Sequence, residues 1–322
     1  RVDEDNQVNA ASLILREIFS GSLTTSLVGF SFSSDTRDDR IAPTKGLRLS
    51  GAIEGAGLGG FSQFARAEGR ANWYLGAPRW LLDRSTFVVG TRVGYAIPFN
   101  VIGDFDLPSA TSIVSDGSIA GLDAIDTDLE LPLSERYFLG GLGSFQLRGF
   151  KARSVGPRRS ILYEATTPEL QGNFIPTGST AAWVDQNGEE LPPDDPDGTW
   201  VAVCTPPATD CNRNTDKDPD EFADLQQTDV IGGNKFISSS LEYRFPISEA
   251  LGLQGVVFFD TGNAFAEGDN LFDVGRWRYG TGAGVQWFSP FGPLGVVLGF
   301  PLDRLSVEDS PVFEFSVGGR DF

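Results

Sequence analysis

The sequence predicts an all-β fold, an antiparallel transmembrane β-barrel to which this chain contributes about nine strands. Apolar and polar residues alternate with a period of two, as in strands that have one apolar and one polar face. These stretches are about 10–15 residues long, whereas strands of globular proteins average about 5–6. Their polar faces carry charged side chains, which the dry core of a soluble β-sandwich would not tolerate. The sandwich, which also alternates, is the alternative interpretation.

The alternating stretches follow one another in two groups, one on each side of a long insertion. In the stretch 234–246, odd positions such as Ile237 and Leu241 are apolar, while the even positions include Glu242 and Arg244. Short connectors at one end alternate with longer ones at the other, as in outer-membrane barrels. The short turns are 35–45, 77–84, 246–250 and 289–292. The predicted strands are 19–33, 46–57, 61–76, 85–99, 234–246, 251–265, 276–288, 292–302 and 311–322.

The composition argues against several classes of function. The chain has 44 acidic and 25 basic residues and a net charge of −19, so we expect no nucleic-acid partner. It has no histidine, which excludes Ser-His and Cys-His catalysis and histidine metal sites. We predict no catalytic residue, no metal site and no cofactor, and do not expect an enzyme. A calcium site in the acidic loop is the less favoured alternative, since no EF-hand spacing is present. No apolar run is long enough for a transmembrane helix.

The pattern divides the chain into four parts. Residues 1–18 form an N-terminal lead-in, 19–99 the first four barrel strands, 100–233 a long acidic extracellular loop folding toward the lumen, and 234–322 the last five strands. The loop carries 15 of the 19 excess negative charges. The chain contains no methionine and opens with no signal peptide, so we expect it to be part of a longer product.

The two cysteines, Cys204 and Cys211, lie in the acidic loop with six residues between them. Two cysteines alone in a compartment that permits disulfides are expected to pair. A metal site built from two cysteines without histidine is the less favoured alternative. We predict a Cys204–Cys211 disulfide that stabilises the chain only locally.

Several motifs, taken in order, resemble the BamA family of outer-membrane insertases. Ser-Glu-Arg-Tyr-Phe-Leu-Gly-Gly at 134–141 precedes Leu-Arg-Gly-Phe at 147–150, like the family's sixth extracellular loop. Phe-Phe-Asp-Thr-Gly-Asn at 258–263 and Trp-Phe-Ser-Pro-Phe-Gly-Pro-Leu at 287–294 resemble later family elements. The resemblance spans about residues 20–322. It implies a 16-stranded barrel in which the strands of this chain are about the eighth to the sixteenth. A smaller complete barrel with an extra strand from Asn9 to Glu17 is the alternative.

The resemblance also implies that a short motif, called the lock below, fixes the long loop inside the barrel. In the family pattern, the loop tip folds back into the lumen, which assigns the lock to Arg148, Gly149 and Phe150. Asp260 is the candidate lumen partner, because it shares the inward parity of Phe258. An aspartate on a transmembrane wall needs a partner, and the planar guanidinium suits a carboxylate. Gly149 would allow a tight backbone turn.

The last predicted strand would form a lateral seam, again by resemblance. Phe313, Phe315 and Val317 make up its lipid-facing set. The terminal Phe322 has the opposite parity, so we expect a bulge at Gly318 and Gly319 to bring it to the lipid side. In the family, this strand pairs weakly with the first strand of the barrel.

The resemblance predicts an insertase that folds and inserts β-barrel proteins through this seam. Its expected partners are unfolded outer-membrane β-barrel proteins, outer-membrane lipids, and accessory lipoproteins that act through POTRA domains outside this chain. The expected location is the bacterial outer membrane. A related exporter, either TamA-like or a two-partner secretion transporter, is the main alternative. A passive porin or surface antigen is a further one, although a 134-residue loop favours a plugged lumen.

Overall fold

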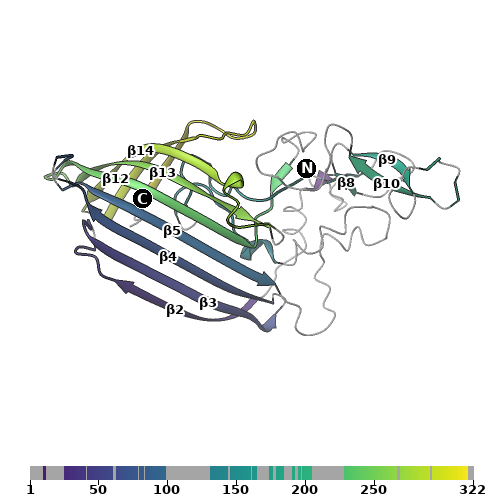
Figure 1. The fold of residues 1–322 in the computed structure, drawn as a ribbon, viewed down its shortest axis with the longest axis horizontal. Helices are drawn as coiled ribbons and strands as arrows, with labels where there is room; N and C mark the ends of the chain where they lie inside the picture. The colour runs from purple at the N-terminus through teal and green to yellow at the C-terminus, as the bar shows by residue number, and fades with distance from the viewer. Residues whose placement is uncertain are drawn as a thin grey trace.

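The computed structural model describes residues 10–11, 25–98, 131–164, 174–204 and 228–317. Within these ranges, a few positions lie outside the description, namely 41, 61–62, 79, 83, 144–145, 161, 177–178, 185–190, 193–194, 197, 267–268 and 291. The predicted fold class is confirmed: the described chain is dominated by one antiparallel nine-stranded sheet (Figure 1). No helix among the described residues is long and apolar enough to cross a membrane.

The strands of this sheet lie in the order β16-β15-β14-β13-β12-β5-β4-β3-β2. Within the groups β2–β5 and β12–β16, each strand therefore pairs with the strands next to it in sequence. The one non-consecutive pairing, β5 with β12, joins the two groups across the insertion. The strands are β2 (Thr25–Asp35), β3 (Gly46–Gly60), β4 (Phe64–Gly76), β5 (Thr86–Pro98), β12 (Lys235–Ser248), β13 (Leu253–Phe265), β14 (Arg278–Ser289), β15 (Gly292–Pro301) and β16 (Val312–Val317).

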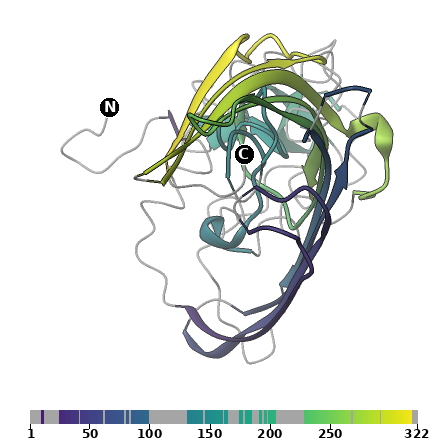
Figure 2. The same cartoon turned by 90° about the vertical axis from the view of Figure 1, so that its left-hand side faces the viewer.

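The alternation predicted from the sequence sorts side chains onto two faces. On β13, Val256 and Phe258 are 1% and 2% exposed, whereas Val257 and Phe259 are 47% and 40% exposed. Successive side chains of a strand point to opposite faces, so the exposed set forms the outer face. The sheet curves strongly, and part of the insertion lies on its concave side (Figure 2).

The strand bounds differ from the predicted ones where a turn is irregular. The pairing of β12 with β13 shifts register between Pro246 and Ser248, so β12 runs to Ser248 and the turn begins later than predicted. Before β14, Val274–Arg276 form a short 3-10 turn capped by the side chain of Asp273. This turn delays the strand from 276 to Arg278.

The insertion between β5 and β12 contains short strands of its own. They are β6 (Arg158–Ser160), β7 (Leu162–Glu164), β8 (Phe174–Pro176), β9 (Ser179–Val184), β10 (Thr199–Cys204) and β11 (Thr228–Val230). The hairpin of β9 and β10 extends beyond one end of the sheet (Figure 1). Residues Ala10–Ala11, β1, pair with β7 of the insertion and not with the large sheet. In the described part, the predicted lead-in thus contacts the loop.

Candidate functional site

Residues 131–143 and 146–157 lie on the concave face of the sheet and are called the docked segment below. Leu139 and Leu147 of this segment are fully buried. They belong to one apolar cluster with wall residues such as Phe64 and Phe236. Tyr137 and Gly233 exchange two backbone hydrogen bonds of 2.9 Å. The segment is therefore packed against the wall as part of the core.

The first half of the docked segment is held by polar side chains of β4 and β5. Nη1 of Arg66 donates to Glu135 at 3.0 Å, and the hydroxyl of Tyr137 donates to Glu68 at 2.9 Å. Farther along, Arg92 donates to the carbonyl of Gly143 at 2.7 Å. The charged inner face predicted from the sequence thus supplies the contacts that bind the segment.

The structure brings Arg148 and Asp260 together. Nε and Nη2 of Arg148 donate to the two carboxylate oxygens of Asp260, each at 2.7 Å. The backbone N–H of Arg148 adds a third bond of 2.9 Å to the same carboxylate. Both side chains are fully buried, and the guanidinium carbon lies 3.9 Å from the ring centroid of Phe258. A two-pronged, charge-assisted contact of this kind fixes both position and orientation.

Arg148 has two further partners on β12 that the sequence analysis did not assign to it. Its Nη2 donates to Ser240 at 2.7 Å, and its Nη1 lies 2.7 Å from Oε1 of Glu242. Burial lowers the pKa of Arg148, but the carboxylates of Glu242 and Asp260 outweigh burial and raise it above its ordinary value. Arg148 therefore remains charged in the buried site.

Register explains why these residues meet. In the β12–β13 ladder, Ser240 lies opposite Asp260, and Glu242 lies opposite Phe258. One patch of the wall therefore presents a hydroxyl and two carboxylates to the same guanidinium. Counting residue pairs back from the turn between β12 and β13 would place Ser240 opposite Asp260. The count succeeds only if the irregularity between Pro246 and Ser248 is included.

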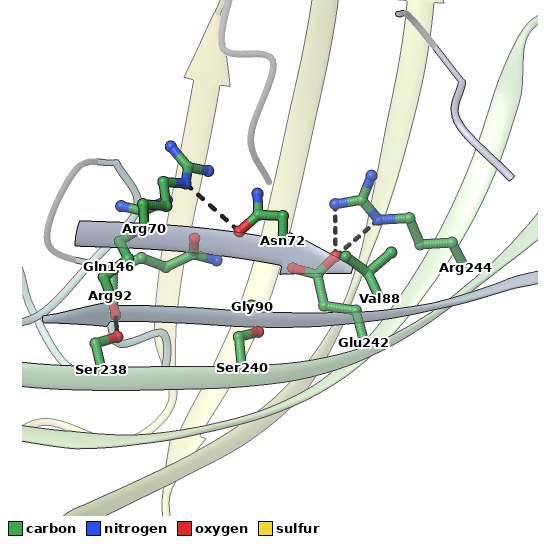
Figure 3. Close-up of a pocket in the computed structure, with 10 residues that line it drawn as sticks. All are labelled: Arg70, Asn72, Val88, Gly90, Arg92, Gln146, Ser238, Ser240, Glu242 and Arg244. Atoms are coloured by element: carbon green, nitrogen blue, oxygen red, sulfur yellow. Dashed lines mark hydrogen bonds and ion pairs between the residues drawn. The ribbon is translucent and has the colours of Figure 1, made fainter. Parts of the chain in front are cut away.

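Glu242 is shared between two arginines, Arg148 and Arg244. Its second oxygen accepts from Arg244 Nε at 2.7 Å (Figure 3). In the same view, Gln146 of the docked segment lies beside Ser238, whose hydroxyl donates to the Gln146 carbonyl at 2.6 Å. The cavity lined by these residues measures about 30 Å³. This volume holds about one or two water molecules.

Gly149 lies where the docked segment touches the backbone of the wall. Its φ of +97° is a conformation that residues with a Cβ rarely adopt. A Cβ at Gly149 would approach the backbone of Phe300 at 3.0 Å. From the wall side, a Cβ at Gly280 of β14 would overlap the carbonyl oxygen of Arg148. Close approach of two backbones thus requires glycine on both surfaces.

Phe150, the third residue of the predicted lock, is buried at 1% exposure. The guanidinium carbon of Arg278 lies 4.9 Å from its ring centroid. Arg278 is held in turn by Asp303 at 2.9 Å and by Glu308 at 2.7 Å, both in the loop between β15 and β16. The ring is therefore clamped by an ion-paired arginine.

The predicted seam residues fall partly within the described strand β16. Phe313, Phe315 and Val317 are 67%, 60% and 68% exposed, so they lie on the outer face. Gly318, Gly319 and Phe322 lie outside the described residues, and the bulge proposed there stays a prediction. In the described sheet, β16 and β2 are the two edges.

The remaining sequence predictions concern the loop. Cys204 ends β10, but Cys211 lies outside the described residues, so their disulfide stays a prediction. Among the side chains that the structure describes, no three metal-ligating residues cluster. The four-part division of the chain is likewise a prediction, although the docked segment belongs to the predicted loop.

Comparison with known proteins identifies the family. The model of the Omp85 superfamily domain matches residues 2–320. The outer membrane protein assembly factor BamA of Nitratidesulfovibrio vulgaris is 35% identical over 97 residues, which are 30% of this chain and 12% of that protein. The solved structure of BamA from Haemophilus ducreyi lacking POTRA domains 1–3 matches with a TM-score of 0.54 and 18% identity.

The structural match covers 90% of this chain and 41% of the solved chain. The chain thus spans less than half the length of these relatives, and its nine-stranded sheet has the fold of part of a BamA barrel. Because the domain model matches almost from end to end, the chain belongs to the Omp85 superfamily.

Proposed function

We propose that this chain forms the C-terminal part of an insertase that folds β-barrel proteins into the outer membrane through a seam at β16. As a member of the Omp85 superfamily, the chain is an outer-membrane β-barrel protein with a part in outer-membrane protein biogenesis. The curated relative is named an assembly factor. Insertion through a seam is the specific activity proposed here.

The observation that carries the proposal is the place of β16 at one edge of the described sheet. Within the described residues, β16 pairs with β15 through six residue pairs, from Gly299↔Val312 to Leu294↔Val317. Backbone groups at a strand edge offer a template for another strand. The outward phenylalanines of β16 would face lipid at this edge.

The proposed activity makes and breaks no covalent bond. The edge of an unfolded substrate would add to β16 by main-chain hydrogen bonding, as in other cases of strand addition. The docked segment would keep the neighbouring wall rigid while the edge moves. Unfolded β-barrel proteins are the proposed substrates, and accessory lipoproteins would bind POTRA domains outside this chain. A locally thinned bilayer near the seam would ease insertion.

Reconstitution of the full-length protein tests this function. The protein would be placed in phosphatidylethanolamine and phosphatidylglycerol vesicles together with its accessory subunits. We expect it to speed the conversion of an unfolded β-barrel substrate to a heat-modifiable, protease-protected form. Arg148→Ala should slow this conversion, while Lys151→Ala, at an exposed lysine three residues on, should not. A water-soluble passenger delivered across the vesicle membrane, with no barrel inserted, would instead support the exporter.

A further inference from the structure

A carboxylate on the edge strand contacts the docked segment. Glu314 lies between the exposed Phe313 and Phe315 of β16, and therefore on the opposite, concave face. Its Oε1 accepts a hydrogen bond from the backbone N–H of Leu142 at 3.2 Å. This bond links the edge of the sheet to a residue 172 positions earlier in the chain.

The turn that meets Glu314 is shaped for close approach. Gly141 has a φ of +76°, and a Cβ there would lie 2.7 Å from Oε1 of Glu314. Leu142 packs against Val256, Phe258 and Val297, the apolar cluster of the neighbouring wall. The N–H that Glu314 accepts therefore belongs to a fixed part of the docked segment.

The carboxylate is incompletely satisfied. Its Oε2 is buried and has no hydrogen-bond partner within the described structure. Buried polar groups are normally paired, and an exception calls for an explanation. Packing alone does not supply one, because an apolar side chain at this position would avoid the desolvation of a carboxylate.

We propose that Glu314 is a positioning residue that couples the docked segment to the seam strand. With the segment docked, Leu142 holds β16 from the concave side, in addition to the ladder of β16 with β15. When the contact is released, the ladder alone retains β16, and the edge opens more readily. We call this contact between the Leu142 N–H and Glu314 the tether. Its role in seam opening rests on the proposed insertase function.

Hydrogen exchange measured by mass spectrometry on the full-length protein in detergent tests the tether. Glu314→Ala removes the acceptor, so exchange in peptides covering 312–317 and 139–143 should rise several-fold. Glu314→Gln keeps an oxygen acceptor at the same place and should behave like the wild type. Ser316→Ala, two residues on and on the same face, is the matched control and should also leave exchange unchanged.

Two results would overturn the tether. One is unchanged exchange at 312–317 in Glu314→Ala. The other is a Glu314→Gln variant as mobile as Glu314→Ala, which would show that the acceptor is not what holds the strand. If Glu314→Ala fails to fold, Gly141→Ala tests the contact from the loop side, because the added Cβ displaces Oε1. A wild-type protein that inserts no substrate would refute the proposed function, while the exchange data would still decide the tether.

Discussion

The hydroxyl of Tyr137 donates to Glu68 at 2.9 Å, and this bond fastens the docked segment to β4. Eleven residues on, Arg148 fastens it to β12 and β13. The segment is thus held on both groups of strands, by contacts of different strength. The β4 contact is partly open to solvent, since the side chain of Glu68 is 37% exposed, whereas Arg148 and Asp260 are fully buried.

Removal of Arg148 should be the most damaging single change in the lock. Arg148→Ala leaves Asp260 and Glu242 without their shared cation, and breaking a buried pair from one side costs about 3–5 kcal/mol. Asp260→Ala should cost less, because Glu242 still pairs with Arg148. The double variant should be less destabilised than the sum of the two. Heat-modifiability of the barrel across the four proteins measures this, and strict additivity would contradict a direct interaction.

Arg148→Lys should restore stability only in part. Lysine keeps the positive charge but not the planar fork that binds both oxygens of Asp260. The same heat-modifiability assay should place this variant between the wild type and Arg148→Ala. Stability equal to that of the wild type would show that charge alone is sufficient.

Gly280→Ala should undock the segment without removing any polar group. A Cβ at this position overlaps the carbonyl oxygen of Arg148, and backbone cannot yield as a flexible side chain can. We expect trypsin to cleave after Arg148, which is fully buried in the docked state. Gly55→Ala on β3, where a Cβ would meet no atom within 4 Å, is the control and should remain resistant.

The Tyr137 contact should give the protein an alkaline dependence of stability. Burial and the nearby Glu68 raise the pKa of Tyr137 above its ordinary value of about 10. A raised pKa means that the stabilisation is fully present below the unfolded-state pKa and is lost as the pH rises toward the folded-state pKa. The midpoint temperature of unfolding should therefore decrease as the pH rises above about 10.

Tyr137→Phe tests this dependence. The variant should lose about 1 kcal/mol near neutral pH, the typical contribution of one hydrogen bond, and part of the alkaline decline. An alkaline decline identical to that of the wild type would show that other groups cause it.

The orientation of the barrel predicts which positions are accessible from outside. In a Cys204→Ser, Cys211→Ser background, a cysteine at Ala182 of the β9–β10 hairpin should react with an impermeant maleimide on intact cells. A cysteine at Ser248, next to a short turn, should react only after the outer membrane is opened. The reverse labelling pattern would invert the proposed topology.

The sequence predicted the nine strands well because alternation over a long strand is a strong signal. It also paired Arg148 with Asp260, through the family motif and the parity of Asp260. Glu242, Ser240 and Glu314 were not assigned to the docked segment. Alternation gives the face on which a side chain lies but not the register between strands, and contacts across a wall depend on register. The irregularity between Pro246 and Ser248 changes that register. Pro246 marks its place in the sequence, but not the register that results.

The contacts of the docked segment also constrain the order in which the protein can fold. Tyr137 contacts a residue 69 positions earlier in the chain, whereas Arg148 and Leu142 contact residues 112 and 172 positions later. Contacts so distant in sequence form slowly, because long stretches of chain must be closed first. The segment can bind β4 before the C-terminal strands have formed, but its contact with Glu314 requires that β16 is in place. Docking of Leu142 on Glu314 would therefore mark the moment at which the whole wall has been assembled.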